Sequence, residues 1–409
     1  MTEQDALHRD LEDPLAHLRA RFDLADDTIY LDGNSLGPPL RTARAAMDAV
    51  IAGQWGQDLI ASWNKHDWIG LPARVGARIA PLIGAAPDEV IVCDSVSVNL
   101  FKLIAAACQA RPGRRTILTE PGNFPTDLYI AQGVAGMMEG RRVRTEPAAT
   151  IAAAIDADTA LVVLTQVHYK SGSRLDMAAI AGAAHAKGAL VLWDLSHSTG
   201  AIAVDLAGCQ ADLAVGCGYK FLGGGPGAPG FLFVAKHLQG DLQSPLAGWM
   251  GHAEPFDFDD GYAPAAGIQR FLCGTPPILA MAALDHALTV FDGIDMEQVE
   301  RKALALGDLF IALVEARCGG FGFALASPRD GHGRGAHVSF AHPQAYAICQ
   351  ALIARGVIGD FRAPDVLRMG FGPLTTRFID VWRAVDRLCD IMTIRAWADP
   401  AFAARQRVT

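Results

Sequence analysis

Short apolar strands alternate with helical segments through the middle of this chain, and no other feature restricts its fold as strongly. We expect strands, in chain order, at residues 89–93, 115–119, 160–165, 189–194, 211–217 and 230–234. Helices are expected at residues 98–110 and 177–187. Strands that are apolar on both faces and alternate with helices predict a mainly parallel sheet covered by helices on both sides.

The pattern changes near residues 261–277, which contain several glycines and prolines. Beyond them, the sequence predicts a smaller set of elements: helices up to about residue 291, at 296–318 and at 344–355, and a strand at 335–340. A chain of 409 residues is also long for one ordinary core. We therefore predict a large domain of residues 55–290 and a smaller α+β domain of residues 1–54 and 291–409.

Composition excludes several classes of partner. The net charge is −9 and lysine and arginine do not cluster, which argues against nucleic acid or an anionic membrane surface. No apolar stretch is long enough to span a membrane, and the acidic N-terminus lacks the pattern of a signal peptide, so we expect a cytoplasmic protein. The eight cysteines are scattered without a C-x-x-C pair, which predicts buried thiols in a reducing compartment and no metal site.

Lysine is scarce in this chain, which has only seven, so a lysine in an apolar, glycine-rich setting is unusual. Lys220 lies in the segment GYKFLGGGPG at residues 218–227, just after a predicted strand. Burial disfavours the charged form of an amine, and a neutral amine can attack an aldehyde to form a Schiff base. A surface lysine on a turn is the alternative, and the local motif alone does not decide between the two.

Asp194 ends the predicted strand ALVLWD, and His197 follows three positions later. The carboxyl ends of strands in an open parallel sheet are where such folds bind ligands. A carboxylate there could pair with the pyridine nitrogen of pyridoxal 5'-phosphate (PLP) and make its ring an electron sink. A lone histidine is more often structural, but the place of His197 beside Asp194 favours a role in the same pocket.

Two weaker signals accompany this pair. Ser95, Ser97 and Asn99 mark the start of a predicted helix, where free amide groups can bind an anion, although an ordinary helix cap would look the same. Phe124, in the segment FPTD, could stack on a flat ring. The order of the signals is informative: an anion-binding helix start, an aromatic residue, an aspartate, a lysine and then a second domain. This order is the layout of fold-type I PLP enzymes, the aminotransferase-like superfamily.

The chain resembles the kynureninase family over nearly its whole length. The motifs that carry the resemblance are YLDGNSLGP at 30–38, FPTD at 124–127, WDLSHS at 193–198, YKFLGGGPG at 219–227, GW at 248–249, GTPP at 274–277, and LR at 367–368 with PL at 373–374. The resemblance implies an α/β fold with a mainly parallel seven-stranded sheet sandwiched by helices, a smaller α+β domain, and a homodimer with shared active sites. It also implies hydrolysis of the Cβ–Cγ bond of L-kynurenine to anthranilate and L-alanine.

The same resemblance implies roles for individual residues. Lys220 would hold PLP and transfer the substrate's α-proton, Asp194 would pair with the pyridine nitrogen, and Tyr219 could relay protons. The other residues expected to bind the cofactor are Val96, Ser97, Phe124, Thr126, Asp127, His197, Trp249 and Thr275, the last two reaching a neighbouring subunit. The family often has asparagine or serine where this chain has Thr275.

The resemblance also implies which residues bind the substrate. Arg368 would clamp the substrate carboxylate, because a guanidinium matches that group with two parallel hydrogen bonds. Ser35, His66 and Trp63 are candidates for contacting the aromatic end. The sequence does not choose between kynurenine and 3-hydroxykynurenine.

The sequence argues against each of three rival functions. A PLP-dependent cysteine desulfurase or selenocysteine lyase needs a loop cysteine in its second domain, and residues 327–337 contain none. A nucleotide-binding loop at 223–230 would need its lysine after the glycines, whereas Lys220 precedes them. A catalytically inactive structural protein would be expected to lose Lys220 or Asp194, and both are present.

Overall fold

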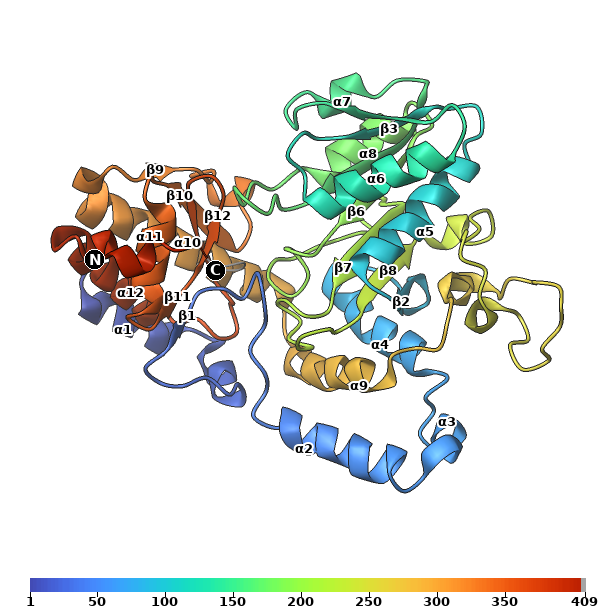
Figure 1. The fold of residues 1–409 in the computed structure, drawn as a ribbon, viewed down its shortest axis with the longest axis horizontal. Helices are drawn as coiled ribbons and strands as arrows, with labels where there is room; N and C mark the ends of the chain where they lie inside the picture. The colour runs from blue at the N-terminus through green and yellow to red at the C-terminus, as the bar shows by residue number, and fades with distance from the viewer. Residues whose placement is uncertain (406–409) are drawn as a thin grey trace.

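The computed structural model of this protein describes residues 1–405, which form two lobes. Figure 1 shows a larger lobe built around one sheet and a smaller lobe that contains both α1 and the last helices of the chain. Their strands are β1 Ile29–Tyr30, β2 Val90–Val92, β3 Thr116–Thr119, β4 Arg142–Thr145, β5 Thr159–Thr165, β6 Leu190–Asp194, β7 Leu213–Cys217, β8 Gly230–Val234, β9 Ala324–Leu325, β10 His337–Ala341, β11 Val357–Ile358, β12 Asp360–Arg362 and β13 Val366–Gly370.

The larger lobe contains a seven-stranded sheet in the order β2-β8-β7-β6-β5-β3-β4. The ladders from β7 through β4 are parallel, while β8 is antiparallel to both β2 and β7. Every residue of β5 to β8 is buried, which explains why these strands are apolar on both faces. The predicted fold class is confirmed, and all six strands predicted for this sheet are present.

The seventh strand, β4, was not predicted from the sequence. It lies at the edge of the sheet, where its four residues, Arg-Val-Arg-Thr, are exposed or only partly buried. An edge strand buries little apolar surface, and charged side chains there discourage pairing with another chain. Its sequence therefore lacks the apolar run by which the central strands are recognised.

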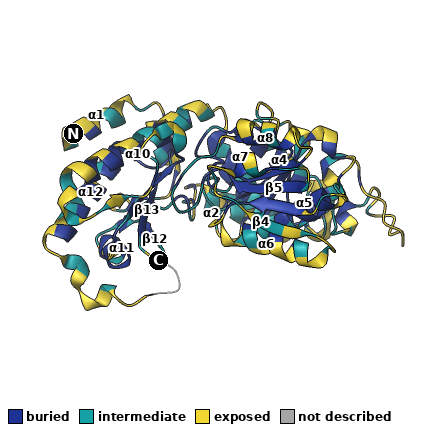
Figure 2. Ribbon diagram, turned by 90° about the horizontal axis from the view of Figure 1, so that it is seen from above, coloured by how far each residue is buried: buried dark blue, intermediate teal, exposed yellow. Residues whose placement is uncertain are grey.

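Helices cover both faces of this sheet, and Figure 2 shows the buried strands enclosed between them, with α8 on one face and α6 on the other. The α-helices of the whole chain are α1 Glu3–Glu12, α2 Ala43–Asp48, α3 Ser62–Lys65, α4 Leu71–Ile79, α5 Val96–Gln109, α6 Pro125–Met137, α7 Ile151–Ala154, α8 Met177–His185, α9 Ile278–Ala287, α10 Met296–Cys318, α11 Ala345–Ile353 and α12 Phe378–Thr393. None of the helices in residues 1–405 is both long enough and apolar enough to cross a membrane.

The smaller lobe has an antiparallel sheet in the order β12-β13-β10-β9, packed with α10, α11 and α12. A separate parallel pair joins β1, near the N-terminus, to β11. Helix α10 has the bounds expected from the sequence. Asp295 caps its first turn, since its side chain accepts a hydrogen bond from the backbone amide of Glu297.

The N-terminal segment contributes to two hydrophobic cores. Ala6, Ile29 and Leu31 belong to the core of the smaller lobe. Phe22 and Leu40 belong to the core of the larger lobe. The segment therefore ties the lobes together instead of packing only with the second one, and the domain boundaries at residues 55 and 291 stay a prediction.

Candidate active site

The carboxyl ends of the parallel strands converge on one cavity of about 180 Å³. Asp194 is the last residue of β6, Cys217 the last of β7 and Thr165 the last of β5. Parallel strands place these ends at the same edge of the sheet, where open α/β folds bind ligands. The cavity is lined by Ser95, Val96, Ser97, Phe124, Thr126, Thr165, Tyr169, Asp194, Ser196, His197, Cys217, Tyr219, Lys220, Ala228 and Gly230.

Lys220 enters this cavity from the loop after β7. Its Nζ lies 5.9 Å from the ring centroid of Phe124 and 5.9 Å from that of Tyr219. The amide of Gly37 donates a hydrogen bond of 2.9 Å to the carbonyl oxygen of Tyr219, and a Cβ at Gly37 would overlap the carbonyl oxygen of Lys220. The N-terminal segment therefore packs directly against the loop and fixes the position of the lysine.

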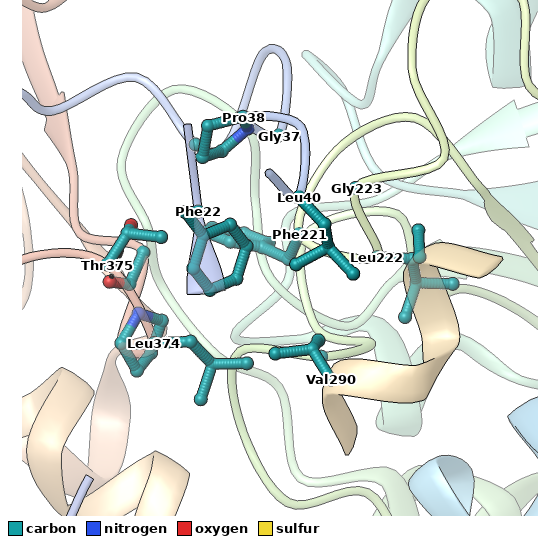
Figure 3. Close-up of a pocket in the computed structure, with 15 residues that line it drawn as sticks. Phe22, Gly37, Pro38, Leu40, Phe221, Leu222, Gly223, Val290, Leu374 and Thr375 are labelled. Atoms are coloured by element: carbon teal, nitrogen blue, oxygen red, sulfur yellow. Dashed lines mark hydrogen bonds between the residues drawn. The ribbon is translucent and has the colours of Figure 1, made fainter. Parts of the chain in front are cut away.

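An apolar contact between the lobes anchors the residues that follow the lysine. Figure 3 shows Phe221 and Leu222 beside Phe22, Leu40 and Leu374 around a second cavity of about 20 Å³. A space of this size holds at most about one water molecule, so the contact is nearly filled. The Lys220 loop is thus held by the N-terminal segment, the larger lobe and residues 372–375 of the smaller lobe.

Asp194 faces the lysine from the end of β6. It is 3% exposed, and its Oδ1 accepts a hydrogen bond of 2.7 Å from the amide of Ser196. Burial raises the pKa of Asp194, while the Ser196 bond and the positive charge of Lys220 oppose that rise. The side chain is therefore a buried acceptor facing a cation, which suits it to pair with a protonated ring nitrogen.

Asp127, predicted to bind the cofactor, is buried and does not line the cavity, although the charge of Asp194 acts on it. Its Oδ2 is 3.1 Å from the hydroxyl of Thr165, and its Oδ1 has no hydrogen-bond partner in residues 1–405. Burial and the charge of Asp194 raise the pKa of Asp127 well above its ordinary value. The charge of each carboxylate therefore disfavours ionisation of the other, which is one cause of the raised pKa of Asp127.

The start of α5 forms the opposite end of the cavity. The hydroxyl of Ser95 caps the helix by accepting from the amide of Val98, and Val96 and Ser97 line the cavity with the first turn. A Cβ at Gly230 would lie 3.1 Å from the amide nitrogen of Val96, so the glycine allows this close approach. A helix N-terminus beside two serine hydroxyls is suited to bind a phosphate.

His197 closes one wall of the cavity. It is 3% exposed, its ring meets that of His337 edge to face at 5.3 Å, and its Nδ1 has no hydrogen-bond partner in the described chain. Burial, together with the charge of Lys220, lowers the pKa of His197 well below its ordinary value. The ring is therefore neutral, and its free nitrogen can hydrogen-bond a ligand in the cavity.

Arg368 lies next to the cavity, within a polar network of the smaller lobe. Its guanidinium binds both carboxylate oxygens of Asp360, donates to the carbonyl oxygen of Tyr169 and lies 3.2 Å from the hydroxyl of Ser35. In the amide orientation that satisfies its neighbours, the oxygen of Asn34 accepts from Nε and Nη2 of Arg368. Of the predicted substrate-binding residues, Arg368 and Ser35 are therefore brought together beside the Tyr169 wall.

The remaining predicted residues do not line this cavity within one chain. His66 hydrogen-bonds Asp58 at 2.7 Å, and Trp63 meets Trp68 edge to face at 5.9 Å. Trp249 contacts Phe256 in the same way at 5.7 Å, and Thr275 lies in an exposed segment.

Sequence reasoning missed some of the residues that shape the site. Tyr169 lines the cavity and meets Phe124 edge to face at 5.3 Å. It follows β5 by four residues, so its place after the carboxyl end of a parallel strand was a usable signal. Asp360 and Asn34 were missed because their roles depend on Arg368, which is distant from Asn34 in the sequence.

Comparisons with known proteins show the family of this chain. The family model described as the kynureninase C-terminal domain matches residues 299–388. The chain is 51% identical to a kynureninase of Burkholderia mallei (strain SAVP1) and 49% identical to one of Pseudomonas fluorescens, with full coverage of each chain in both cases. The chain belongs to the kynureninase family.

This family membership confirms the resemblance predicted from the sequence motifs, and with it an enzyme whose family hydrolyses a carbon–carbon bond. Solved structures add the fold. A C-DES mutant with glycine covalently linked to the PLP cofactor has a TM-score of 0.78 at 19% identity, covering 91% of this chain and 99% of that one. The cysteine desulfurase CsdA of Escherichia coli has a TM-score of 0.76 at 19% identity, covering 93% and 98%. The likeness to desulfurases is therefore one of fold, whereas the kynureninase likeness extends over the whole sequence.

Proposed function

We propose that this chain is a PLP-dependent hydrolase that cleaves the Cβ–Cγ bond of L-kynurenine to give anthranilate and L-alanine. The observation that carries the proposal is the place of Lys220, near two aromatic rings and Asp194, in a chain that is 51% identical to a kynureninase over its full length. The 3-hydroxy form of kynurenine is a second candidate substrate of the same site.

The residues of the cavity fit PLP. The first turn of α5, with Val96, Ser97 and nearby Thr126, would hold the phosphate, and Phe124 would face the ring. Asp194 would pair with the pyridine nitrogen, and the free nitrogen of His197 would gain a partner. Lys220 would hold the cofactor covalently through its amine. When bound, PLP supplies an electron sink for bonds broken at the substrate's α-carbon.

The remaining steps belong to the chain's own groups. Lys220, once its amine is free, would remove the α-proton of the substrate. Tyr219 lines the cavity beside it, and its pKa is raised by burial, so its hydroxyl stays protonated and can donate to the substrate's carbonyl oxygen as water adds. Arg368, which lies next to Ser35, is the candidate to bind the substrate carboxylate.

The second part of the proposal is a homodimer with shared sites, in the cytoplasm. Figure 1 shows α2 and α3 on an arm at the edge of the larger lobe, and a long loop before α9 that projects from the same lobe. The arm and the loop both carry large apolar side chains that are exposed in the single chain, and a large exposed apolar patch is typical of an interaction surface. These residues are Ile51, Trp55, Leu59, Ile60, Trp249, Phe256, Phe258 and Tyr262. If a second copy covers the arm and the loop, Trp249, Thr275 and His66 of one subunit would lie close to the cavity of the other subunit.

A product assay tests the choice of substrate. Purified, PLP-loaded protein is offered L-kynurenine, 3-hydroxy-L-kynurenine and L-cysteine in separate reactions, and anthranilate, 3-hydroxyanthranilate and sulfide are measured. We expect anthranilate from L-kynurenine or 3-hydroxyanthranilate from its 3-hydroxy form, and no sulfide from L-cysteine. Sulfide from L-cysteine, with neither anthranilate nor 3-hydroxyanthranilate formed, would contradict the proposal and favour the desulfurase alternative.

A further inference from the structure

Two cysteine sulfurs lie against each other in the smaller lobe, far from the cavity along the chain. Sγ of Cys318 is 2.7 Å from Sγ of Cys389. Cys318 is the last residue of α10, and Cys389 lies in the final turns of α12, which packs along α10. Among residues 1–405, no other pair of cysteine sulfurs is in contact, so this pair is distinct from the other six thiols.

The separation of the two sulfurs is close to that of a covalent bond. A disulfide has a sulfur–sulfur length of about 2.05 Å, so closing the bond requires the sulfurs to move together by less than about 1 Å. Both helices are already packed in the core of the smaller lobe, which places the two side chains together without any change of fold. The two residues are 71 positions apart, so a bond between them would close a long loop.

The surroundings assign different tasks to the two thiols. Cys318 is fully buried, and burial together with the neighbouring sulfur raises the pKa of its thiol. The guanidinium of Arg317, which also lies over the ring of Trp382 at 4.9 Å, opposes that rise in pKa. Cys389 is partly exposed whereas Cys318 is buried, so of the two thiols Cys389 is the one expected to meet an oxidant first.

We propose that Cys318 and Cys389 form a reversible disulfide when they meet a small disulfide oxidant such as oxidised glutathione. The thiolate of Cys389 attacks one glutathione sulfur and releases one glutathione thiol. Cys318 then attacks Sγ of Cys389 as its proton passes to the departing glutathione sulfur, which releases the second glutathione thiol. The two protein thiols lose two protons and two electrons in total, and one oxidised glutathione gains them to become two reduced molecules.

The bond would link the end of α10 to α12 and thereby restrain the smaller lobe. Closing a long loop stabilises the folded chain mainly by restricting the unfolded chain. None of the residues that line the cavity belongs to α10 or α12, so turnover of kynurenine is expected to change little. The predicted effect of oxidation is a higher Tm with nearly unchanged kcat.

Mass spectrometry tests the proposal directly. The full-length, PLP-loaded protein is incubated with excess oxidised glutathione, its remaining thiols are blocked with N-ethylmaleimide, and the products are digested without reductant. We expect one cross-linked peptide pair that contains Cys318 and Cys389, and its loss after treatment with dithiothreitol. Blocked Cys318 and Cys389, or glutathione retained on Cys389 without the cross-link, would overturn the proposal.

Two variants complete the experiment. Cys389→Ser should abolish both the cross-linked peptides and the rise in Tm on oxidation. Cys273→Ser removes another partly exposed thiol, which has no sulfur beside it, and should retain both effects. A rise in Tm that survives in Cys389→Ser would show that oxidation acts elsewhere, and the cross-link in the native chain decides the outcome if that variant fails to fold.

Discussion

Asp360 positions Arg368 by accepting from two of its nitrogens, and both side chains are almost fully buried. The same carboxylate also binds Arg362 at 2.7 Å and Ser35 at 2.9 Å. Asp360 therefore compensates two cations next to the cavity, and its charge keeps the guanidinium of Arg368 in one orientation. Its pKa is lowered by Arg368, despite burial, so it stays ionised at neutral pH.

We predict that Asp360→Asn weakens substrate binding more than it slows the bond-breaking steps. Losing a charged hydrogen-bond acceptor should raise KM for L-kynurenine by about 10- to 100-fold, with a smaller change in kcat. Steady-state kinetics of the PLP-loaded variant measures both constants. Glu315→Gln, which breaks an exposed pair with Arg329, is the matched control, and equal effects of both variants would contradict this role.

Glu120 gives a second prediction, which concerns pH and stability. Burial raises its pKa from 4.5 to about 7 in the folded chain, and its Oε1 has no hydrogen-bond partner in residues 1–405. Because the folded pKa is the higher one, its contribution to stability is complete below pH 4.5 and is lost as the pH rises through about 7. This difference corresponds to at most about 3 kcal/mol.

Glu120→Gln should therefore lessen the loss of stability between pH 5 and pH 8. Urea unfolding at the two pH values measures the free energy of unfolding of each protein. Glu315→Gln, at an exposed position, should keep the pH dependence of the native chain. An unchanged slope in Glu120→Gln would show that other groups carry the pH dependence.

Among the residues of the site, those recognisable from sequence carry chemistry that few side chains supply. Lys220 and Asp194 were predicted because a rare lysine and a strand-terminal carboxylate are conspicuous, and both line the cavity. Asp360 and Tyr169 were not predicted, because each acts through a contact made only in the folded chain. The roles assigned to individual residues remain proposals that the variants above test.

At the level of elements, the contact between the N-terminal segment and the Lys220 loop controls the position of the lysine. The amide of Gly37 binds the carbonyl oxygen of Tyr219, and a side chain at residue 37 would collide with the backbone of Lys220 and Gly223. The strands before and after the loop, β7 and β8, are fully buried and offer a rigid frame. The loop itself therefore has to move if residue 37 becomes larger.

We predict that Gly37→Ala displaces the Lys220 loop and lowers kcat by up to about 100-fold, since a displacement of about 1 Å can cost that much. Gly113→Ala is the matched control, because no atom lies within 4 Å of a Cβ placed there. Steady-state assays with L-kynurenine measure the effect, and circular dichroism checks that both variants fold. Equal activity of the two variants would contradict the proposed positioning.

The elements predicted best are those whose burial is uniform. Strands β5, β6 and β7 bury every residue, so their sequences are continuous apolar runs. The edge strand β4 and the two-residue strands β1 and β11 bury too little surface to leave such a pattern. The antiparallel direction of β8 was also not predicted, because apolar content does not encode strand direction.

For the whole molecule, the proposed dimer would change which residues surround each cavity. Trp249, Thr275 and His66 do not line the cavity of their own chain, and exposed apolar side chains lie on the same arms. No pattern in the sequence of a single chain specifies which residues cross to a partner. The predicted roles of these three residues therefore depend on the assembly.

A complementation experiment tests shared sites. Lys220→Ala and a Trp249→Ala, Thr275→Ala double variant should each have little activity alone. Mixed after partial unfolding and refolding with PLP, they should form hybrid dimers in which one cavity has every native residue, so part of the activity returns. Mixtures that stay inactive, although hybrid dimers are seen by native mass spectrometry, would contradict shared sites.

In the proposed function, hydrolysis of kynurenine depends on Lys220 in this cavity. The most direct test follows anthranilate fluorescence after L-kynurenine is added to the PLP-loaded protein, with Lys220→Ala as the comparison. We expect anthranilate from the native chain and none above background from the variant. Equal turnover by Lys220→Ala, or no anthranilate from a native protein that holds PLP, would contradict it.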